Sequence, residues 1–560
     1  MRVGARGFIR RSLVELSRIH MQETVDVLIC GAGPVGLTLA SQLESMGVSW
    51  RLIDKAVCPS DKSKALVLWG RSLELLNTSL DAGVFLAAGR PVRNANFYWK
   101  GNAFAQLDFS EGEDKFGTGI LIPQNSTEQI LVDDLVQAGG EIERGIELVS
   151  FEQIHGKVRC MVSDQSGKHE TIMARFMVGC DGAHSAVRHG LGLSFEGVKD
   201  GLRWVLADVE LTGDVPDADV LSMWSPLGIL LLFHFEKDTW RVVAEEPLAS
   251  ENAPRRDPTL QEIQQHLDRR GARKLRVSNP KWLAEFRVSE RIVKDYQMGS
   301  VFLAGDAAHV HSPAGGQGMN TGIQDACNLA WKLAWNLRGV GTPLLLESYA
   351  AERHRIGQHV VRTTSRITRL ATTDSRLLQG IRNVVAGIAL RFEWIRRKVK
   401  ANLGEYAVNY RQSDINGRDS RRHRNAFRCG DRVPDFTWFD GDGHKQSLYQ
   451  RLSGGRAVLI ILNEGAHHAP EVWKELTDRH GDSFNVVKLF SSGDFPDEST
   501  RLESDSEMVA YDVVPADEAS KLPFGNGGWG VIRPDGYLAA LGDCDDMSAA
   551  TQWLLRVTSL

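Results

Sequence analysis

Cysteine is scarce in this sequence, and long apolar runs are missing from it. The 560 residues include seven cysteines, namely Cys30, Cys58, Cys160, Cys180, Cys327, Cys429 and Cys544. They are odd in number and scattered, and none belongs to a C-x-x-C pair, which favours a reducing compartment over a disulfide-stapled secreted scaffold. No apolar stretch approaches the ~20 residues of a membrane span. We therefore expect a cytoplasmic protein without a membrane span.

A strong net charge is also missing. The chain has 66 basic and 71 acidic residues and a net charge of −5, which gives no general attraction to nucleic acid. The exception is the segment before residue 23, where five arginines stand against Glu15 alone. Such a start resembles an organelle transit peptide. The alternative is an extension upstream of a true start at Met21, which we prefer.

A glycine motif stands close to the start of the chain. Gly31-Ala32-Gly33-Pro34-Val35-Gly36 follows an apolar strand predicted over Val25–Cys30 and opens a helix predicted over Leu37–Met46. Glycines at these positions allow a tight turn and a close approach of the backbone to a pyrophosphate. The N-terminus of the helix offers unpaired N–H groups to the same anion.

The motif is completed by an acidic residue. Asp54 ends a second strand, predicted over Val48–Asp54, where its carboxylate can accept hydrogen bonds from a ribose hydroxyl. The combination of strand, glycines, helix and acidic residue predicts a dinucleotide site rather than a glycine-rich turn without a ligand.

Two later segments narrow the choice of dinucleotide. A predicted strand ends in Gly305-Asp306 and leads to the glycine-rich stretch Gly315–Asn320, which a long helix follows. Another predicted strand, Phe176–Cys180, leads to Asp181-Gly182. An NAD dehydrogenase needs no second glycine-rich loop so far along the chain, whereas a flavoprotein must also hold the ribityl chain and the flavin ring.

Together these segments resemble the class A flavoprotein monooxygenases, the family of p-hydroxybenzoate and phenol hydroxylases, over residues 25–355. The resemblance implies FAD as cofactor, NAD(P)H as co-substrate and O2 as oxidant. The FAD-binding residues that it implies are Gly31, Gly33, Pro34, Val35, Gly36, Asp54, Lys55, Lys64, Gln124, Asp181, Arg188, Gly305, Asp306, Pro313, Gly315, Gly316, Gly318, Met319 and Asn320.

The resemblance also implies separate roles within this set. Asp306 would bond the ribityl chain, and Pro313 would lie against the flavin ring. The helix that follows the glycine-rich stretch would point its N–H groups at the pyrimidine edge, where reduced flavin carries negative charge. Asp181 and Arg188 would serve both FAD and NAD(P)H. We expect no metal site, because His309 and His311 lack cysteine or carboxylate partners in the sequence.

The middle of the chain has the alternating pattern of a β-sheet. Strands are predicted over 204–211, 220–224, 229–235 and 240–245. By resemblance this sheet is the substrate domain, and its candidate pocket residues are Trp224, Phe233, His234 and Trp240. His234 is a weak candidate for a base acting on a phenol. For each aromatic residue the competing interpretation is core packing, since alternation points only half of them at a pocket.

The C-terminal part resembles the thioredoxin-like domain of phenol hydroxylases and polyketide hydroxylases. It lacks C-x-x-C, so we expect no dithiol chemistry there. We expect truncation near Asn425 to leave bound FAD, and a homodimer, if one forms, to use the C-terminal or helical region.

The predicted fold is α/β, with a Rossmann-like FAD-binding domain, an interleaved β-sheet substrate domain and a C-terminal thioredoxin-like α/β domain. The predicted boundaries are 1–22 for the basic extension, 23–195 and 291–355 for the FAD-binding domain, 196–290 for the substrate domain, 356–424 for a helical segment and linker, and 425–560 for the thioredoxin-like domain.

The implied function is hydroxylation of a phenolic or polyketide aromatic substrate through a flavin C4a-hydroperoxide. The same fold leaves Baeyer–Villiger oxidation, flavin dehydrogenation and halogenation open, although the W-x-W-x-I-P pattern expected of a halogenase is missing. A flavin-binding sensor without turnover is the alternative from another class. The substrate itself does not follow from the sequence.

Overall fold

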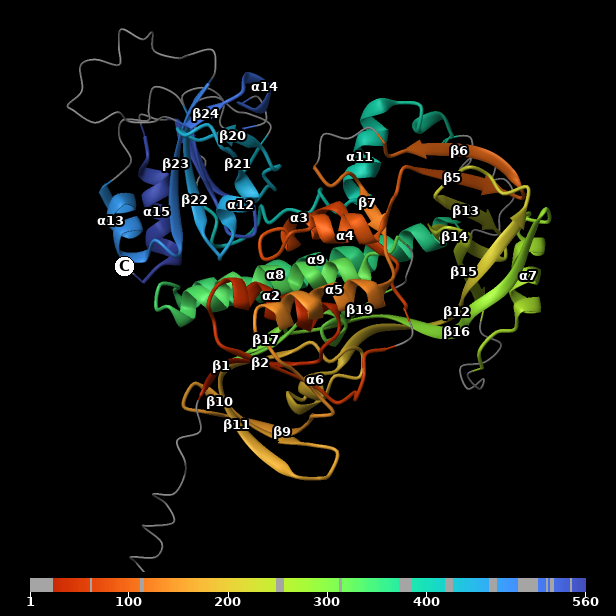
Figure 1. The fold of residues 1–560 in the computed structure, drawn as a ribbon, viewed down its shortest axis with the longest axis horizontal. Helices are drawn as coiled ribbons and strands as arrows, with labels where there is room; N and C mark the ends of the chain where they lie inside the picture. The colour runs from red at the N-terminus through yellow and green to blue at the C-terminus, as the bar shows by residue number, and fades with distance from the viewer. Residues whose placement is uncertain are drawn as a thin grey trace, which may run out of the picture.

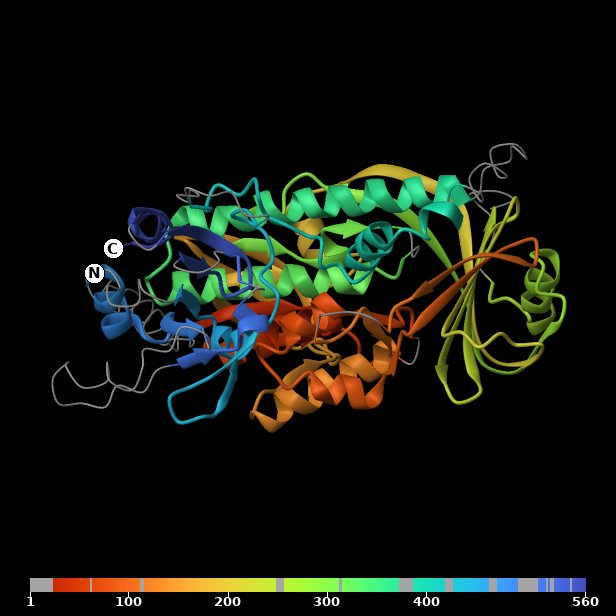
Figure 2. The same cartoon turned by 90° about the horizontal axis from the view of Figure 1, so that it is seen from above.

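The computed structural model describes residues 24–60, 63–110, 115–247, 256–311, 315–371, 385, 387–417, 427–462, 471–491, 512–519, 522–523, 528–543 and 546–559. The extension predicted for residues 1–22, Pro313 and part of the predicted linker lie outside these residues. Three large sheets surround the two long helices α8 (Gly318–Leu337) and α9 (Pro343–Ala371) (Figure 1). The second and third sheets lie at opposite ends of the long axis (Figure 2).

The first sheet is the Rossmann-like part of the molecule. Its strands run in the order β17-β18-β11-β1-β2-β8, with β10 beside β11 and β9 beside β10. From β18 to β8 all neighbours are parallel. Its strands are β1 (Val25–Cys30), β2 (Trp50–Asp54), β8 (Ile142–Arg144), β9 (Glu147–Ile154), β10 (Lys157–Ser163), β11 (His169–Gly179), β17 (Gln297–Met298) and β18 (Val301–Leu303).

The local sequence explains the first strand–helix unit. β1 has the predicted bounds, and its last four residues are buried, as in a strand covered on both faces. Helix α2 (Pro34–Ser45) begins with a proline at its first position, where the missing N–H costs nothing. It buries every residue from Gly36 to Leu43, because it packs against both α5 (Gln124–Gln137) and α8.

The second sheet contains all four strands predicted for the middle of the chain. Its order is β19-β16-β12-β15-β14-β13-β5-β6. Its strands are β5 (Asn94–Trp99), β6 (Asn102–Asp108), β12 (Phe195–Gly213), β13 (Val220–Ser225), β14 (Gly228–Glu236), β15 (Thr239–Pro247), β16 (Leu275–Val293) and β19 (His309–Val310).

The second sheet is wider than the predicted substrate domain. β5 and β6 come from the segment 23–195, and β19 comes from the segment 291–355, both of which we assigned to the FAD-binding domain. β5 joins the edge by parallel pairing with β13, a contact between residues more than 100 positions apart. Strand patterns carry no information about such a distant partner, so these additional strands were not expected. β12 itself begins at Phe195, beside the predicted boundary at residue 196.

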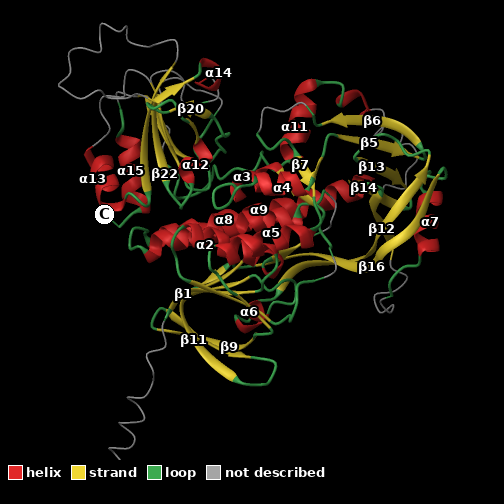
Figure 3. Ribbon diagram, in the orientation of Figure 1, coloured by secondary structure: helices red, strands yellow, loops and turns green. Residues whose placement is uncertain are grey.

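One helix covers the outer face of the second sheet. Helix α7 (Leu260–Arg269) lies on the side away from the long helices (Figure 3). It starts at a capping box, in which the Thr259 side chain accepts from the N–H of Glu262 and the Glu262 carboxylate accepts from the N–H of Thr259. Its Ile263 and Leu267 are fully buried against the sheet.

The third sheet has the arrangement predicted for the C-terminal domain. Parallel β22 and β23, joined by α13, are followed by antiparallel β25 and β26 and then by α15, with β26-β25-β22-β23 as spatial order. The elements are β20 (Thr437–Phe439), β21 (Lys445–Ser447), α12 (Leu448–Leu452), β22 (Ala457–Leu462), α13 (Glu471–His480), β23 (Phe484–Ser491), β24 (Asp512–Val514), α14 (Ala516–Ala519), β25 (Gly528–Ile532), β26 (Leu538–Asp543) and α15 (Ser548–Val557).

The remaining described elements are short. They are β3 (Val67–Trp69), α3 (Gly70–Leu76), α4 (Gly83–Ala88), β4 (Arg90–Pro91), β7 (Gly119–Leu121), α6 (Ala186–Gly190), the 3₁₀ turn η1 (Gly305–Ala307) and α11 (Glu393–Leu403). β3, β7 and β4 form a small sheet of their own. None of the helices in the described part of the chain combines the length and the apolar character of a membrane span.

Buried charges join the third sheet to the long helices. Arg533 follows β25 and binds the Glu352 carboxylate of α9 with both terminal nitrogens, at 2.7 and 2.9 Å. The same guanidinium also binds Asp535. Lys332 of α8 approaches Glu352 to 2.7 Å, and Asn328 donates to both Glu352 and Asp535. Arg533, Glu352 and Lys332 are essentially inaccessible to solvent.

These contacts change what we expect of the C-terminal domain. Removing residues 427–560 would leave the Lys332–Glu352 pair without Arg533 and would expose the buried side of α8. A second set of buried contacts would be lost at Glu74, which binds Arg432 at 2.7 and 2.8 Å. The expectation that a truncated protein retains FAD is therefore not supported, because the truncated chain would lack part of its core.

We predict that Arg533→Met lowers the free energy of unfolding by about 3–5 kcal/mol, the usual cost of removing one partner of a buried ion pair. Methionine keeps an unbranched apolar stem but leaves the carboxylates of Glu352 and Asp535 without their shared cation. Urea unfolding followed by tryptophan fluorescence measures the change. The matched control is Arg479→Met, because Arg479 is exposed and pairs with exposed Glu475. It should shift stability by about 0.5 kcal/mol or less, and equal effects of the two variants would contradict the prediction.

Candidate active site

The glycine loop between β1 and α2 has two positions that admit only glycine and one that is open. Gly31 has φ of +106°, and a Cβ there would lie 2.4 Å from the carbonyl oxygen of Cys180. A Cβ on Gly36 would lie 1.9 Å from the carbonyl oxygen of Gly31. A Cβ on Gly33 would meet no atom within 4 Å. Gly31 and Gly36 therefore serve packing, and Gly33 faces space that a ligand can enter.

The N-terminus of α2 has the features of an anion-binding site. Gly33 is the N-cap and has no side chain to cap the helix, and Pro34 and Val35 form the first turn. Unsatisfied N–H groups and the positive end of the helix dipole thus point into the open space. The Val35 side chain packs away from it, against Gly305 and Gly322, where a Cβ would come within 2.7 and 2.6 Å. Val35 thereby brings the glycine loop next to the loop that follows β18.

Asp54 lies beside the glycine loop. Its Oδ2 accepts a hydrogen bond from the N–H of Ala32 at 2.7 Å, and its Oδ1 accepts one from the N–H of Ala56 at 2.8 Å. The carboxylate is therefore fixed in position and keeps acceptor capacity for a further donor. Lys55, the next residue, is exposed.

The loop after β18 is held by a buried network that sequence patterns did not reveal. Asp325 of α8 accepts from the N–H of Gly305 at 3.0 Å and lies 2.8 Å from Nε2 of His309. Its other oxygen accepts from Nε of Arg353 at 2.6 Å. Arg353 also donates to the Tyr410 hydroxyl and to the carbonyl of Thr321. His309 is thus a structural residue of this loop.

Asp306 occupies a recess in the protein. Burial raises the pKa of its carboxyl group, and the nearby His309 and Lys64 act in the opposite direction. The side chain is nevertheless exposed. Both observations hold when protein surrounds the carboxyl group on most sides while an opening leaves its oxygens accessible. Such a recess suits a ligand that brings its own hydroxyl donors.

Asn320 fixes the glycine-rich stretch at the start of α8. Its Oδ1 accepts from the N–H of Trp69 at 2.8 Å, and its Nδ2 donates to the carbonyls of Val67 and Gly316, both at 2.9 Å. Gly315 and Gly316 have positive φ angles of +92° and +63°, which favour glycine. Gly318 begins α8, and Met319 packs partly buried against the core.

Two further predicted residues, Lys64 and Gln124, lie together. The Gln124 side chain accepts from the N–H of Ala65 at 3.2 Å, and Lys64 is exposed. Arg241 of the second sheet reaches the same segment, donating to the carbonyl of Ala65 at 3.2 Å. Arg241 is buried and forms a bidentate pair with Asp208 at 2.7 and 2.8 Å. No sequence pattern indicates this link between the second sheet and the Lys64 segment.

Asp181 and Arg188 organise the end of β11. The Oδ2 of Asp181 accepts from the N–H of Ala186 at 2.6 Å, at the start of α6. Arg188 stacks on the ring of Phe195 at 4.0 Å and donates to the carbonyl of Ala307. Burial lowers the pKa of Arg188. Arg188 thus lies next to the loop that carries Asp306, whereas Asp181 lies beside Gly31 of the glycine loop.

The comparisons with known proteins agree with this geometry. Residues 24–364, more than half of the chain, match the family described as FAD binding domain. The chain belongs to this FAD-binding family. FAD is therefore its cofactor, and the predicted resemblance to class A flavoprotein monooxygenases is confirmed at the level of the family.

Named relatives extend over most of the chain. An uncharacterized aromatic compound monooxygenase of Bacillus subtilis is 33% identical over 452 residues, which cover 81% of this chain and 88% of the relative. A 6-methylpretetramide 4-monooxygenase of Streptomyces rimosus is 32% identical over 535 residues, covering 92% and 90%. Among solved structures, the anhydrotetracycline hydroxylase OxyS of Streptomyces rimosus superposes with a TM-score of 0.72 at 27% identity, covering 95% and 98%.

The residues present fit FAD. Gly33 leaves the open space that the diphosphate would need, and Asp54 would bind the ribose of the adenosine half. Asp306 lies accessible in its recess and would bind the ribityl hydroxyls. The sites assigned to the two halves are far apart in the sequence and are brought together at Val35, which touches the Gly305 loop.

The second sheet corrects two of the predicted pocket residues of this flavoprotein. His234 and Trp240 stack on each other at 4.5 Å with an interplanar angle of 5°. Trp240 is buried in the cluster that contains Ile263 and Leu267 of α7. Both therefore lie on the outer face of the sheet, away from the FAD-binding domain. His234 is not retained as a candidate base.

The inner face of the sheet carries the other aromatic residues. Phe233 packs in the cluster that contains Val67 and Trp69, next to the glycine-rich stretch. Trp224 donates through Nε1 to Ser222 and lies farther along this face, with its ring 6.0 Å from Phe97. Of the predicted pocket residues, Phe233 is thus the one that packs against the segment next to the flavin loops.

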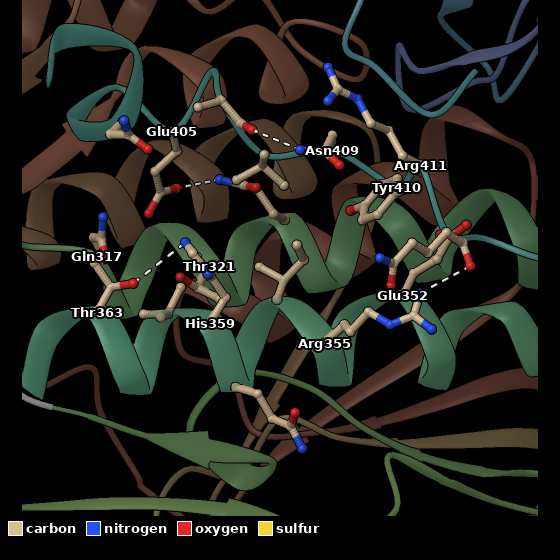
Figure 4. Close-up of a pocket in the computed structure, with 18 of the residues that line it drawn as sticks. Gln317, Thr321, Glu352, Arg355, His359, Thr363, Glu405, Asn409, Tyr410 and Arg411 are labelled. Atoms are coloured by element: carbon tan, nitrogen blue, oxygen red, sulfur yellow. Dashed lines mark hydrogen bonds between the residues drawn. The ribbon is translucent and has the colours of Figure 1, made fainter. Parts of the chain in front are cut away.

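A groove opens between α9 and the segment that follows α11 (Figure 4). Its volume is about 650 Å³, and Gln317, Thr321 and Glu405 are among the residues that line it. Glu405 is 4% exposed and has φ of +61°, a conformation that is strained for glutamate. Its Oε2 accepts from the Gln324 amide, and its Oε1 is buried without a hydrogen-bond partner in the described part of the chain.

Glu405 is an acid held in its neutral form. Burial raises the pKa of its carboxyl group to about 8, while the charge of Arg353 and the hydrogen bond from Gln324 lower it and Asp325 raises it. A protonated carboxyl group can donate one hydrogen bond as well as accept others. No sequence pattern marks this residue, because its burial depends on the packing of distant helices.

We predict that Gly33→Val strongly weakens FAD binding without unfolding the chain. The φ of −84° at Gly33 suits any L-residue, and no neighbouring atom obstructs the new side chain. The valine would occupy the space in which the diphosphate approaches the backbone. We expect retained flavin per protein to fall about tenfold or more, at unchanged far-ultraviolet circular dichroism. Gly33→Ala is the graded control and should lose less flavin; a fully loaded Gly33→Val protein would refute the assignment.

We also predict that Glu405 makes the protein less stable as the pH rises. Its folded pKa of about 8 lies above the ordinary value of 4.5, so the folded state keeps a proton that the unfolded chain releases. The associated stability is complete below about pH 4.5 and is lost as the pH rises to about 8. Glu405→Gln cannot titrate, and it should gain roughly 2–4 kcal/mol relative to the original protein between pH 5 and pH 8.5. Chemical denaturation at both pH values, with exposed Glu393→Gln as control, measures this gain, and a pH-independent difference would count against the buried acid.

Proposed function

We propose that this flavoprotein is an NAD(P)H-consuming monooxygenase that inserts one oxygen atom of O2 into a phenolic or polyketide aromatic substrate. The main observation that supports this proposal is that the Gly33 loop, the Asp306 loop and the start of α8 meet at one place in the fold. Relatives named as aromatic monooxygenases over more than four fifths of the chain support the same reaction.

The bound FAD supplies electron transfer and oxygen activation, chemistry that side chains cannot provide. The protein binds and orients it. In our assignment the N–H groups at the start of α2 bind the diphosphate, Asp54 binds the ribose and Asp306 binds the ribityl hydroxyls. Asn320 positions the start of α8 through its three hydrogen bonds, so that the positive end of this helix stabilises negative charge on the flavin edge.

The inner face of the second sheet provides the apolar side of the site. Phe233 and Phe235 contact the cluster that holds Val67 and Trp69. Trp282 donates to Asp208 and lies under the Arg241 guanidinium. The charges of Arg241 and Asp208 on this face are therefore paired with each other. An apolar wall excludes water and offers ring surface to an aromatic substrate.

Fold alone does not decide the reaction. A solved structure described as the Diels–Alderase PyrE3, a name that denotes a different reaction, matches 92% of this chain with a TM-score of 0.69 at 24% identity. The proposal rests on the relatives of higher identity and on the geometry of the FAD cradle, and the test must therefore follow the oxygen atom.

We predict that purified protein oxidises NAD(P)H faster when a phenolic or polyketide aromatic compound is added, and that the product gains one oxygen. Under (18)O2 the product should carry the heavy isotope, whereas H2(18)O should leave it unlabelled. Mass spectrometry measures both, and fragmentation distinguishes a new hydroxyl group from the ring-expanded lactone of a Baeyer–Villiger reaction. Label from water alone would exclude a monooxygenase, and unchanged NAD(P)H oxidation across a broad aromatic panel would favour a sensor.

Two further parts of the proposal concern the setting of the enzyme. We place it in the cytoplasm, where NAD(P)H is supplied. A homodimer, if one forms, would use the helical region, because Ile388, Phe392 and Trp394 expose 50%, 54% and 67% of their surface there. Analytical ultracentrifugation tests this, and a Trp394→Lys variant with unchanged association would argue against that surface.

A further inference from the structure

Exposed apolar side chains are concentrated in one short segment of the chain. Thirteen large apolar residues are exposed in the described part of the chain, and four of them fall within residues 385–394. These four are Val385, Ile388, Phe392 and Trp394, of which Trp394 is the most exposed at 67%. The other nine are spread from Val57 to Leu555. Single exposed apolar residues need no explanation, whereas a group of them marks an interaction surface.

Helix α11 carries part of this segment and has two different faces. Val399 and Leu403 pack against the apolar cluster on the inner face of the second sheet. At 3.6 residues per turn, Trp394 lies on the side of the helix opposite Leu403. Arg397 and Lys398 follow Trp394 by three and four residues and share its face, and all three are exposed. The outer face of α11, which lies at the periphery of the fold in Figure 1, therefore combines an aromatic ring with two bases.

Basic residues outnumber acidic ones in the same segment. Five bases fall between Gly387 and Ala401, with Glu393 as the one acid among them. The bases are Arg391, Arg396, Arg397, Lys398 and Lys400. The chain as a whole has a net charge of −5, so this basic excess is local. A local excess of bases beside exposed apolar side chains indicates an anionic partner with an apolar part.

Two of these bases have no acidic partner in the described part of the chain. Arg397 pairs with Glu393 at 2.6 Å. Hydrogen bonds from a neighbouring serine lower the pKa of Asp108 on β6, and the charges of two further bases of the segment act in the same direction. Arg391 and Lys398 remain, and both are exposed without an ion pair to any carboxylate of the described residues. An anion from outside the chain can therefore approach both.

A groove of about 530 Å³ lies between β6 and residues 387–391. Phe104 of β6 lines it, together with Ile388, Leu390 and Arg391. Leu390 also packs against the apolar cluster that α11 covers. Ile388 and Arg391 thus belong to the groove as well as to the exposed surface. A partner must therefore fill an uneven apolar surface, and flexible acyl chains can adapt to such a shape.

We propose that residues 388–398, the docking segment, hold the protein on the surface of an anionic lipid bilayer. Ile388, Phe392 and Trp394 would enter the boundary between headgroups and acyl chains, where tryptophan is typically found. Arg391 and Lys398 would lie beside the acidic headgroups, which attract exposed bases. The segment lies on the bilayer rather than crossing it, because α11 has only 11 residues.

A second copy of the chain suits the docking segment less well. Contacts across a two-fold axis bring the same surface of both chains together. The bases around Trp394 would then meet the bases of the other copy, and such like charges weaken an interface. An anionic bilayer instead supplies the opposite charge. The homodimer considered above is therefore the competing occupant of this surface, and the experiment must distinguish the two.

The test is cosedimentation of the full-length, FAD-loaded protein with vesicles. One set is pure phosphatidylcholine, and the other contains equal parts of phosphatidylcholine and phosphatidylglycerol. We expect binding to the second set alone, and weaker binding as salt is added, because salt screens exposed charges. Trp394→Ser should lower the partition coefficient about tenfold. The Arg391→Gln/Lys398→Gln double variant should lower it by about fivefold for each charge removed.

Matched controls come from other surfaces of the molecule. Leu555→Ser removes an exposed apolar side chain from α15. The Arg269→Gln/Arg273→Gln double variant removes two exposed bases at the end of α7 and just after it. Both controls should bind the anionic vesicles as the original protein does. Vesicle binding requires no turnover, so this result is independent of the proposed function, and FAD content should be the same in all variants.

Several outcomes would overturn the inference. Binding to neither set of vesicles, or equal binding to both, would show that the surface does not recognise anionic lipid. Unchanged binding of the Arg391→Gln/Lys398→Gln variant would have the same meaning. Sedimentation velocity without vesicles covers the competing occupant: a dimer that Trp394→Ser converts to monomers would assign the docking segment to a second copy.

Discussion

The buried carboxylate of Asp325 is the contact on which the arrangement of the site depends. It connects three segments that no short-range pattern joins: the Gly305 loop, α8 itself, and Arg353 of α9. Asp325 and Arg353 are both inaccessible to solvent, so the pair is stable only because each charge is compensated by the other and by further hydrogen bonds. Nearby groups hold the pKa of Asp325 below its usual value, with Arg353 as the largest of them, against the effect of burial. The loop that carries Asp306 is thereby fixed to the two long helices.

The neighbouring residue extends this arrangement to the C-terminal domain. Glu352 precedes Arg353 in α9 but binds Arg533 and Lys332 instead. One turn of α9 thus meets the flavin loop on one side and the third sheet on the other. The C-terminal domain has no dithiol and no flavin motif, which suggested from sequence that it is dispensable. Its contribution is packing and charge compensation, which motif analysis does not register.

The parts of the fold that followed from sequence are those fixed by local sterics and apolar runs. β1 and the four central strands were predictable because buried strands are short apolar runs between turn residues. Glycine at positions 31 and 36 was recognisable as part of a motif, but the contacts that exclude a side chain there are visible only in the structure. What could not be predicted depends on distant partners. Alternation along β14 indicated that half of its side chains face a pocket, but only the position of α7 decides that His234 belongs to the other half.

The remaining acids show where ligands belong. In the core, Glu352, Asp325 and Glu74 all have cationic partners within 2.8 Å, as burial of charge requires. Asp306 and Glu405 differ, because burial raises the pKa of both and neither has an ion pair in the described part of the chain. An acid of this kind costs stability unless another group uses it. One of the two lies in the recess assigned to FAD, and the other lies in the groove that opens beside the glycine-rich stretch.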